Sequence, residues 1–166
     1  TTAYELALIT NYALKNEIFH NIVGTKNYTI SINGYSKNLS NTNELLGNLD
    51  GVYGVKTGFT NGANRCLVTS VKRDNMDLIC VVLGADTKKD RTKDSCQLIK
   101  YAFQNYKMIN IKEKILSEFA NWKICNSSSF VVEKGISNSV DVVLEDLTYN
   151  FLPIDCNHIN DISIYI

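Results

Sequence analysis

The residues with the clearest chemical potential are Lys56, Thr57 and Gly58, a Lys-Thr-Gly triplet that follows the apolar run starting at Val52. An ammonium group supplies positive charge and the neighbouring hydroxyl supplies a directional donor, so the pair suits a carboxylate-bearing ligand. Glycine at the third position permits close approach of a ligand backbone. A free strand edge here could also pair with a peptide. A solvated lysine before a turn is the alternative interpretation.

Three predicted strands position this triplet. Residues 52–57 form the first strand, which ends at the triplet, and 58–64 form a Gly/Asn-rich loop. Residues 65–72 and 77–83 form the second and third strands, joined by a two-residue turn at Asp74-Asn75. That turn predicts an antiparallel register with these facing pairs: Val71 and Leu78, Val68 and Val81, Thr69 and Cys80, Cys66 and Leu83. Because Cys66 and Cys80 then point to opposite faces, a disulfide between them is disfavoured.

Helices are predicted on either side of this sheet. Thr2-Ala3-Tyr4-Glu5 is a capping box, and the helix that follows to about Lys15 is so apolar that we expect it to be mostly buried. Residues 92–106 place apolar side chains at helical spacing. The unbroken apolar run 78–83 requires cover on both faces. The predicted fold is therefore α+β, an antiparallel sheet flanked by helices.

Shorter elements are predicted between the first helix and the sheet. Residues 16–23 indicate a short helix with Ile18, Phe19 and Ile22 inward. An alternating strand at 28–32 enters a primed hairpin turn at Asn33-Gly34, and 41–46 could form one helical turn.

After Lys107 the pattern changes to short β-like runs separated by Asn, Ser and Gly. We predict a β-rich second domain over 107–166. About 60 residues form only a marginal core, so we expect this domain to be incomplete or to complete itself by pairing with another chain. The runs are 108–111, 122–125, 130–133, 140–144 and 162–166.

Composition excludes several classes. Of 166 residues, 17 are basic and 17 acidic, which argues against a nucleic-acid binder. No apolar run approaches the roughly 20 residues of a membrane span. The five cysteines form no metal-ligand cluster, and Cys66, Cys80 and Cys96, which lie inside apolar runs, are read as small apolar residues rather than a disulfide framework. The first residue is Thr and a helix begins at once, so we expect a fragment of a longer protein.

Five ordered segments carry a resemblance to a known family. The sequence resembles the low-molecular-mass penicillin-binding proteins, the serine-type D-Ala-D-Ala carboxypeptidases, over residues 1 to about 106. The Lys-Thr-Gly element is a recognised motif of that superfamily. The segments are Thr2-Ala3-Tyr4-Glu5-Leu6-Ala7-Leu8-Ile9, Asn41-Thr42-Asn43-Glu44-Leu45-Leu46, Gly54-Val55-Lys56-Thr57-Gly58-Phe59-Thr60, Arg65-Cys66-Leu67-Val68 and Val81-Val82-Leu83-Gly84-Ala85.

The resemblance implies the C-terminal part of a penicillin-binding, β-lactamase-like transpeptidase domain over 1–106, followed by a small β-rich domain over 107–166. The family reaction also needs a Ser-x-x-Lys and a Ser-x-Asn. No Ser-x-x-Lys occurs, and Thr69-x-x-Lys72 lies on a predicted strand, where the two side chains point apart. The Ser-x-Asn matches at Ser31 and Ser36 are attributed to chance. The nucleophile is therefore expected upstream of Thr1.

By resemblance, Lys56 would bind the serine of the Ser-x-Asn element and keep the site positive. Thr57 would bind the substrate's terminal carboxylate beside Gly58, and the Phe59 backbone N–H would be one oxyanion donor. Arg91 would lie near the carboxylate subsite, with a plain helix-start charge as the alternative. His20 and His158 match no family position and are read as structural or exposed.

The implied parent protein trims peptidoglycan stem peptides ending in D-Ala-D-Ala through an acyl-serine, without a cofactor, and is inhibited by β-lactams. It would act outside the cytoplasm, on the cell-wall side of the bacterial membrane, held there only by a C-terminal anchor absent from this sequence. A β-lactamase or transpeptidase of the same superfamily is one alternative. A non-catalytic scaffold or stem-peptide binder is another, and the isolated chain could form a homodimer.

Overall fold

The computed structural model describes residues 1–126 and 151–155. The chain divides into two compact units, Thr1–Gln104 and Asn105–Ile166, which are described separately. No helix within the described residues is long and apolar enough to span a bilayer.

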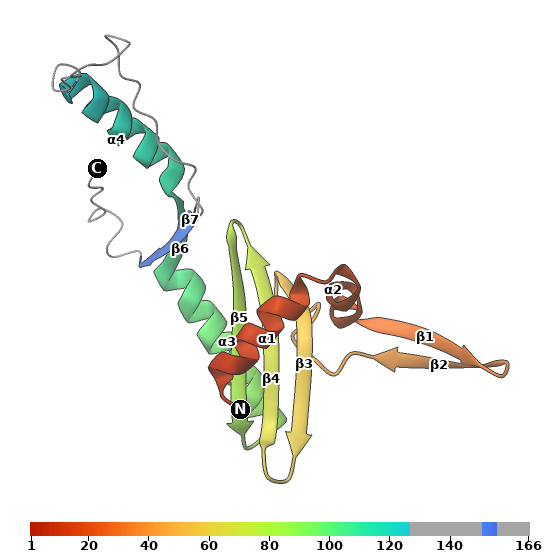
Figure 1. Cartoon of the computed structure of the whole chain (residues 1–166). Helices are drawn as coiled ribbons and strands as arrows, with labels where there is room; N and C mark the ends of the chain where they lie inside the picture. The colour runs from red at the N-terminus through yellow and green to blue at the C-terminus, as the bar shows by residue number, and fades with distance from the viewer. Residues whose placement is uncertain (127–150, 156–166) are drawn as a thin grey trace. The chain divides into compact units, whose positions relative to one another are not determined.

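The first unit is built on a three-stranded antiparallel sheet in the order β3-β4-β5 (Figure 1). Its strands are β3 (Val52–Thr60), β4 (Asn64–Arg73) and β5 (Met76–Ala85). The Asp74-Asn75 turn sets the predicted register, with Val71 opposite Leu78, Val68 opposite Val81 and Thr69 opposite Cys80. The Cys66–Leu83 pair is absent from the ladder, because the register shifts between Arg65 and Leu67. Gly84, at φ +73°, lies on the strand opposite this irregularity.

β3 is longer than predicted, which changes the setting of the Lys-Thr-Gly triplet. Pairing with β4 continues through Gly58 opposite Cys66 and Phe59 opposite Arg65 to Thr60 opposite Asn64. The predicted loop 58–64 is therefore reduced to residues 61–63. The triplet lies inside an edge strand and does not end it, because cross-strand pairs keep both strands extended.

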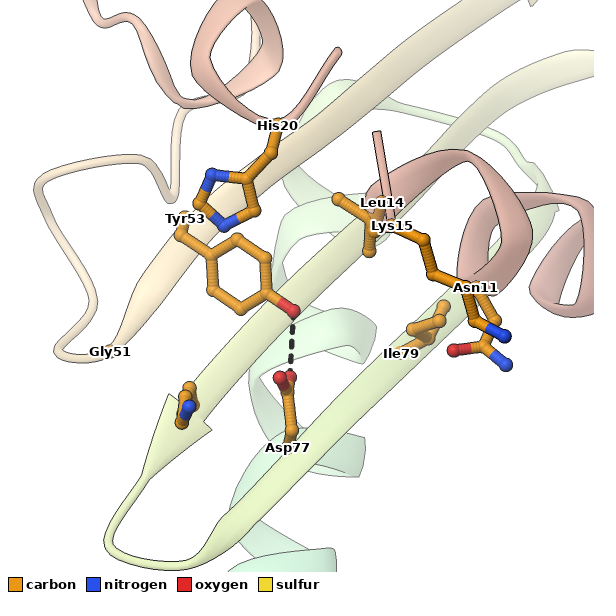
Figure 2. Close-up of a pocket in the computed structure, with 9 residues that line it drawn as sticks. Asn11, Leu14, Lys15, His20, Gly51, Tyr53, Asp77 and Ile79 are labelled. Carbon is orange, nitrogen blue, oxygen red and sulfur yellow. Dashed lines mark hydrogen bonds between the residues drawn. The ribbon is translucent and has the colours of Figure 1, made fainter. Parts of the chain in front are cut away.

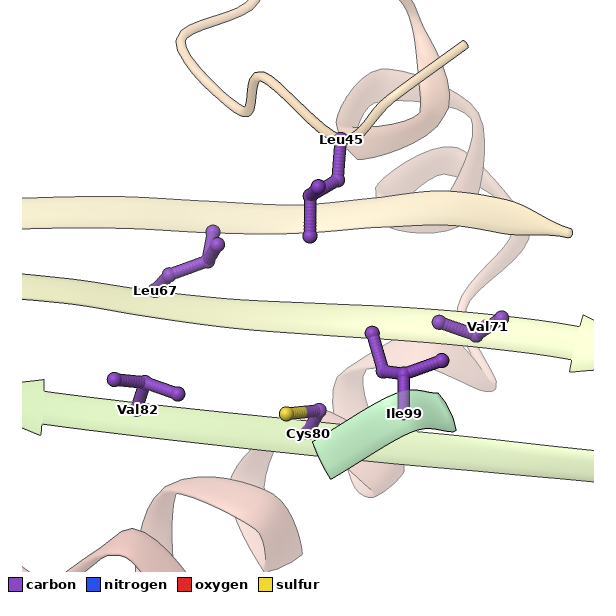
Figure 3. Packing of buried hydrophobic residues seen from close by; sticks show 6 residues of the cluster. All are labelled: Leu45, Leu67, Val71, Cys80, Val82 and Ile99. Carbon is purple, nitrogen blue, oxygen red and sulfur yellow. The ribbon is translucent and has the colours of Figure 1, made fainter. Parts of the chain in front are cut away.

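Helices flank this sheet, as predicted. α1 (Ala3–Leu14) lies over one face in Figure 1 and α3 (Lys88–Asn105) lies over the other. Ile99 of α3 packs into the apolar core formed with the sheet (Figure 3), which consists of Leu45, Leu67, Val71, Cys80, Val82 and Ile99. α3 begins earlier than the predicted residue 92, where the Thr87 hydroxyl accepts the Asp90 backbone N–H at 3.1 Å.

The predicted burial of the first helix is wrong, and that of the second is wrong for two of its three residues, since only Phe19 is half-buried. The capping box is present, with Glu5 N–H bonded to Thr2 Oγ1 and Thr2 N–H bonded to the Glu5 carboxylate. However, Tyr12 is 80% exposed and only Thr10 of α1 is buried. Ile18 and Ile22 of α2 (Glu17–Gly24) are also exposed. Among the described residues no element covers these apolar faces.

A hairpin follows α2. β1 (Asn27–Ile32) and β2 (Tyr35–Ser40) pair antiparallel, and Asn33 and Gly34 adopt φ values of +52° and +81°. These values confirm the predicted primed turn. Residues 41–43 have no regular structure and residues 44–46 lie in turns, so the predicted helical turn does not form. The Asn43 side chain accepts the Leu45 N–H at 3.1 Å, and such local bonds compete with helix formation.

The described part of the second unit contains β6 (Tyr106–Asn110), α4 (Ile111–Asn126) and β7 (Phe151–Asp155), with β6 and β7 antiparallel. The predicted strand at 122–125 is wrong, because these residues lie in α4. There Trp122 stacks on Phe119, three residues earlier and on the same helix face, at 5.9 Å. The predicted runs at 130–133, 140–144 and 162–166 lie outside the described residues. A β-rich domain over 107–166 stays a prediction.

The cysteines of the described residues are free thiols: Cys66, Cys80, Cys96 and Cys125. The absence of a Cys66–Cys80 disulfide agrees with the register, which places the two on opposite sheet faces. Among the described residues no group of three His, Cys, Asp or Glu side chains is placed to hold a metal ion.

Candidate active site

The Lys-Thr-Gly triplet lies along β3, at one edge of the described three-stranded sheet. Lys56 is exposed, and its Nζ donates to the Thr57 carbonyl at 2.6 Å. Thr57 is half-buried, and its hydroxyl lies 2.6 Å from the Thr42 hydroxyl. Because side chains alternate along a strand, Lys56 and Thr57 project to opposite faces of the sheet. The Lys56 ammonium and the Thr57 hydroxyl therefore lie on opposite sides of the free edge of β3 in the described sheet.

The segment 41–45 is held against β3 by Asn43. This side chain is only 2% exposed. Its Nδ2 donates to the Gly54 carbonyl at 2.8 Å, and its Oδ1 accepts the Leu45 N–H at 3.1 Å. Both ends of the amide are thus satisfied inside the protein, as a buried polar group requires.

The same segment reaches α3 through Glu44. Arg91 is buried at 3% exposure, and its Nη2 lies 3.4 Å from Glu44 Oε2. The same carboxylate oxygen accepts the Thr92 hydroxyl at 2.7 Å. Arg91 Nε has no hydrogen-bond partner among the described residues. The segment 41–45 therefore connects the edge strand to the start of α3, through the contact of Thr42 with Thr57 and that of Glu44 with Arg91.

Beyond the triplet, Phe59 and Arg65 face each other across β3 and β4. The Arg65 guanidinium lies 3.7 Å from the centre of the Phe59 ring, which is 52% exposed. A Cβ added at Gly58 would meet only Cys66 Cβ, at an ordinary 3.6 Å. The described residues therefore do not require glycine at position 58, and the space beside it is available to a ligand.

A second polar cluster lies nearer the start of β3 (Figure 2). The Tyr53 hydroxyl donates to Asp77 at 2.7 Å, and the His20 ring stacks on Tyr53 at 4.9 Å between centroids. Burial, together with the hydrogen bond to the Asp77 carboxylate and its negative charge, raises the pKa of Tyr53 to about 12. His20 thus has a packing role here, which agrees with its structural reading. His158 lies outside the described residues.

The sequence predicted that Lys56, Thr57, Gly58 and Phe59 lie side by side, and in the structure these four consecutive residues all lie on β3. The sequence did not single out Thr42, Glu44 or Arg65 as side chains that contact this region. Nothing in their local pattern indicates those contacts, because each partner lies on a different element. The catalytic and binding roles of the five candidate residues stay predictions.

Comparison with known proteins supplies the family. The family model for D-alanyl-D-alanine carboxypeptidase matches residues 1–87. D-alanyl-D-alanine carboxypeptidase DacF of Bacillus subtilis is 38% identical over 107 residues, 64% of this chain and 28% of DacF. DacD of Escherichia coli is 33% identical over 113 residues, 67% of this chain and 28% of DacD. The chain therefore spans less than a third of the length of these curated relatives.

Solved structures agree at the level of the fold. The DD-transpeptidase of Streptomyces K15 is 33% identical, with a TM-score of 0.59 over 63% of this chain and 42% of that one. Penicillin-binding protein 6B of Escherichia coli, at 22% identity, has a TM-score of 0.66 over 98% of this chain and 42% of that one. With its family-model match over more than half of its length, the chain belongs to the D-alanyl-D-alanine carboxypeptidase family.

Proposed function

We propose that this chain is the Lys-Thr-Gly-bearing part of a penicillin-sensitive D-Ala-D-Ala carboxypeptidase that trims peptidoglycan stem peptides outside the cytoplasm. The observation that carries the proposal is the triplet's position on β3, an edge strand of the described sheet, within the residues matched by the family model. An extended peptide can pair with such an edge while side chains on both faces contact it.

The reaction begins when a serine attacks the carbonyl carbon of the penultimate D-Ala. The C–N bond breaks, the terminal D-Ala leaves with a proton on its nitrogen, and water hydrolyses the acyl-serine ester. This serine would come from residues outside the present sequence, since no Ser-x-x-Lys occurs here. β-Lactams would inhibit by acylating the same serine.

Lys56 would supply positive charge and bind the serine of the upstream Ser-x-Asn element, and the Phe59 N–H would donate to the oxyanion. Thr57 would bind the substrate carboxylate. Its 2.6 Å contact with Thr42 supports that role. If Thr42 donates in this contact, the Thr57 proton stays free for the carboxylate.

Arg91 would act in a different way from an open carboxylate-binding side chain. It is buried and its charge is already paired with Glu44, so its contribution to the subsite would be support of the Thr42–Glu44 segment. This assignment predicts that Arg91 affects substrate binding and folding together.

A transpeptidase is the second candidate, favoured by the solved Streptomyces K15 DD-transpeptidase at 33% identity. The two activities share acylation and differ in the group that resolves the acyl-serine, water in one and an amine in the other. Products formed from a D-Ala-D-Ala peptide with and without an added amino acid acceptor distinguish them.

The central test replaces Lys56 in the longer protein that contains this chain. Lys56→Ala should slow acylation by benzylpenicillin by roughly 10²-fold or more, since preorganised charge at an acyl-transfer site has effects of that order. Lys72→Ala is the matched control, because Lys72 is an exposed lysine on the neighbouring strand β4. Equal effects of the two variants would overturn the assignment.

The present chain gives a second readout. Its intact mass should be unchanged by benzylpenicillin, and it should release no D-Ala from a stem peptide. A stable adduct would place an acylating serine within these 166 residues and refute the division of the active site. Self-association through the exposed faces of α1 and α2 is also expected of the isolated chain, and sedimentation velocity would detect it.

A further inference from the structure

The β1–β2 hairpin presents an exposed apolar face. Cross-strand pairs place Tyr28 opposite Leu39 and Ile32 opposite Tyr35, with Ile30 between them. These five side chains form what we term the apolar hairpin face. Tyr28 is 63% exposed, Ile32 61%, Tyr35 81% and Leu39 41%. In Figure 1 the hairpin extends away from the β3-β4-β5 sheet of the first unit.

The opposite face of the hairpin is entirely polar. It consists of three cross-strand pairs in which the side chains bond to each other: Ser40 to Asn27 at 3.0 Å, Thr29 to Asn38 at 2.8 Å, and Ser31 to Ser36 at 3.2 Å. A sheet with one polar face in water requires an apolar partner for the other face. The alternation therefore marks a surface built to be covered.

The apolar hairpin face continues onto α2. Ile22, which is 66% exposed, lines a cavity of about 470 Å³ together with Tyr28 and Leu39. Lys26 lies at the same cavity. A hydrophobic surface thus runs from the helix along the hairpin to its tip at Tyr35.

The charges around this surface all have one sign. Residues 18–43 contain no Asp or Glu, whereas Lys26 and Lys37 are both present and exposed. Lys37 pairs with Ile30, so its ammonium emerges from the apolar hairpin face itself. Two copies joined through this face would bury the Lys37 ammonium of each without a carboxylate from residues 18–43 to pair with it, and an unpaired buried charge is costly. An anionic partner surface instead neutralises the lysines.

We propose that the apolar hairpin face docks onto the surface of an anionic lipid bilayer. Amphipathic elements with apolar and aromatic side chains on one side and lysines beside them lie in the headgroup region, where tyrosine is favoured. Each lysine near an anionic surface adds about 1 kcal/mol of attraction. This inference goes beyond the proposed function and does not depend on it.

The test measures co-sedimentation of the intact chain with vesicles of equimolar phosphatidylglycerol and phosphatidylcholine, and with vesicles of phosphatidylcholine alone. The double variant Ile32→Thr/Tyr35→Thr should bind the anionic vesicles roughly tenfold more weakly, because it removes apolar area at the hairpin tip. The matched control, Ser31→Thr/Ser36→Thr, introduces the same residue type at neighbouring positions on the polar face and should bind like the unmodified chain.

Lys37→Gln tests the electrostatic part while keeping every apolar side chain. It should weaken binding to the anionic vesicles roughly fivefold and change binding to phosphatidylcholine little. Circular dichroism of each variant checks that the hairpin still folds.

Three results would overturn the proposal: no binding of the unmodified chain to anionic vesicles, equal loss in the two double variants, or equal affinity for both lipid compositions. A dimer in solution that Ile32→Thr/Tyr35→Thr abolishes would instead identify a second copy as the occupant of this face.

Discussion

Asn43→Ala tests how the segment beside the candidate site is held in place. The substitution removes the donor to the Gly54 carbonyl and the acceptor for the Leu45 N–H in one step. Asn43 is 2% exposed and Leu45 4%, and Gly54 is also buried, so water has little access to the groups left behind. Both orphaned groups then carry a desolvation cost.

The expected loss of stability follows from these two unpaired groups. A buried donor or acceptor without a partner costs about 1–3 kcal/mol. Partial entry of water into the space vacated by the amide lowers the sum, so we expect a loss of about 3 kcal/mol in the free energy of unfolding. For a unit of this size, such a loss lowers the unfolding temperature by roughly 15 °C.

The assay is urea unfolding followed by circular dichroism, with thermal unfolding as the second measurement. Asn48→Ala is the matched control, because Asn48 also donates its Nδ2 to a backbone carbonyl, that of Glu44 at 2.7 Å, but is exposed. It should cost about 0.5 kcal/mol or less, since water replaces the lost partner. Equal losses in the two variants would refute the argument that burial makes Asn43 important.

Two further predictions concern titratable groups. Tyr53 ionises near pH 10 when unfolded but at about 12 when folded, because burial and Asp77 favour its neutral form. Its contribution to stability is therefore complete below pH 10 and is lost as pH rises toward 12. Tyr53→Phe should reduce that decline in urea unfolding, Tyr12→Phe on the exposed part of α1 should not, and equal pH dependence in both would contradict the assignment. Burial raises the pKa of the Cys80 thiol to about 11, whereas Cys125 is exposed. A thiol-alkylating reagent at neutral pH should modify Cys125 first and Cys80 only on unfolding, as read by peptide mass spectrometry, and early modification of Cys80 would show that the core opens locally.

Several features of this protein follow from residues close together in the sequence. The Thr2–Glu5 capping box, the Asn33-Gly34 turn and the Asp74-Asn75 turn were predicted correctly, because each depends on backbone preferences and hydrogen bonds that span only a few residues. The β4–β5 register follows from the Asp74-Asn75 turn. The apolar run 78–83 also predicted helices on both faces of the sheet, since neither face could remain in water.

Two of the wrong predictions have different causes: one is an ambiguous local pattern, and the other is burial, which depends on distant neighbours. Residues 122–125 have β-like composition, but the same residues also place Trp122 against Phe119 at helical spacing, and short apolar runs do not distinguish the two periods. The apolar composition of α1 predicted burial, yet burial depends on which neighbour is present and not on the helix itself.

In the candidate site, too, some features follow from local sequence and others depend on tertiary packing. The sequence by itself determined which chemical groups lie along β3, because Lys56, Thr57, Gly58 and Phe59 are consecutive. Only the tertiary structure decided that Thr42 contacts Thr57, 15 residues away, and that Glu44 contacts Arg91, 47 residues away. Such contacts depend on how strands and helices pack, and no local preference of either partner specifies that packing.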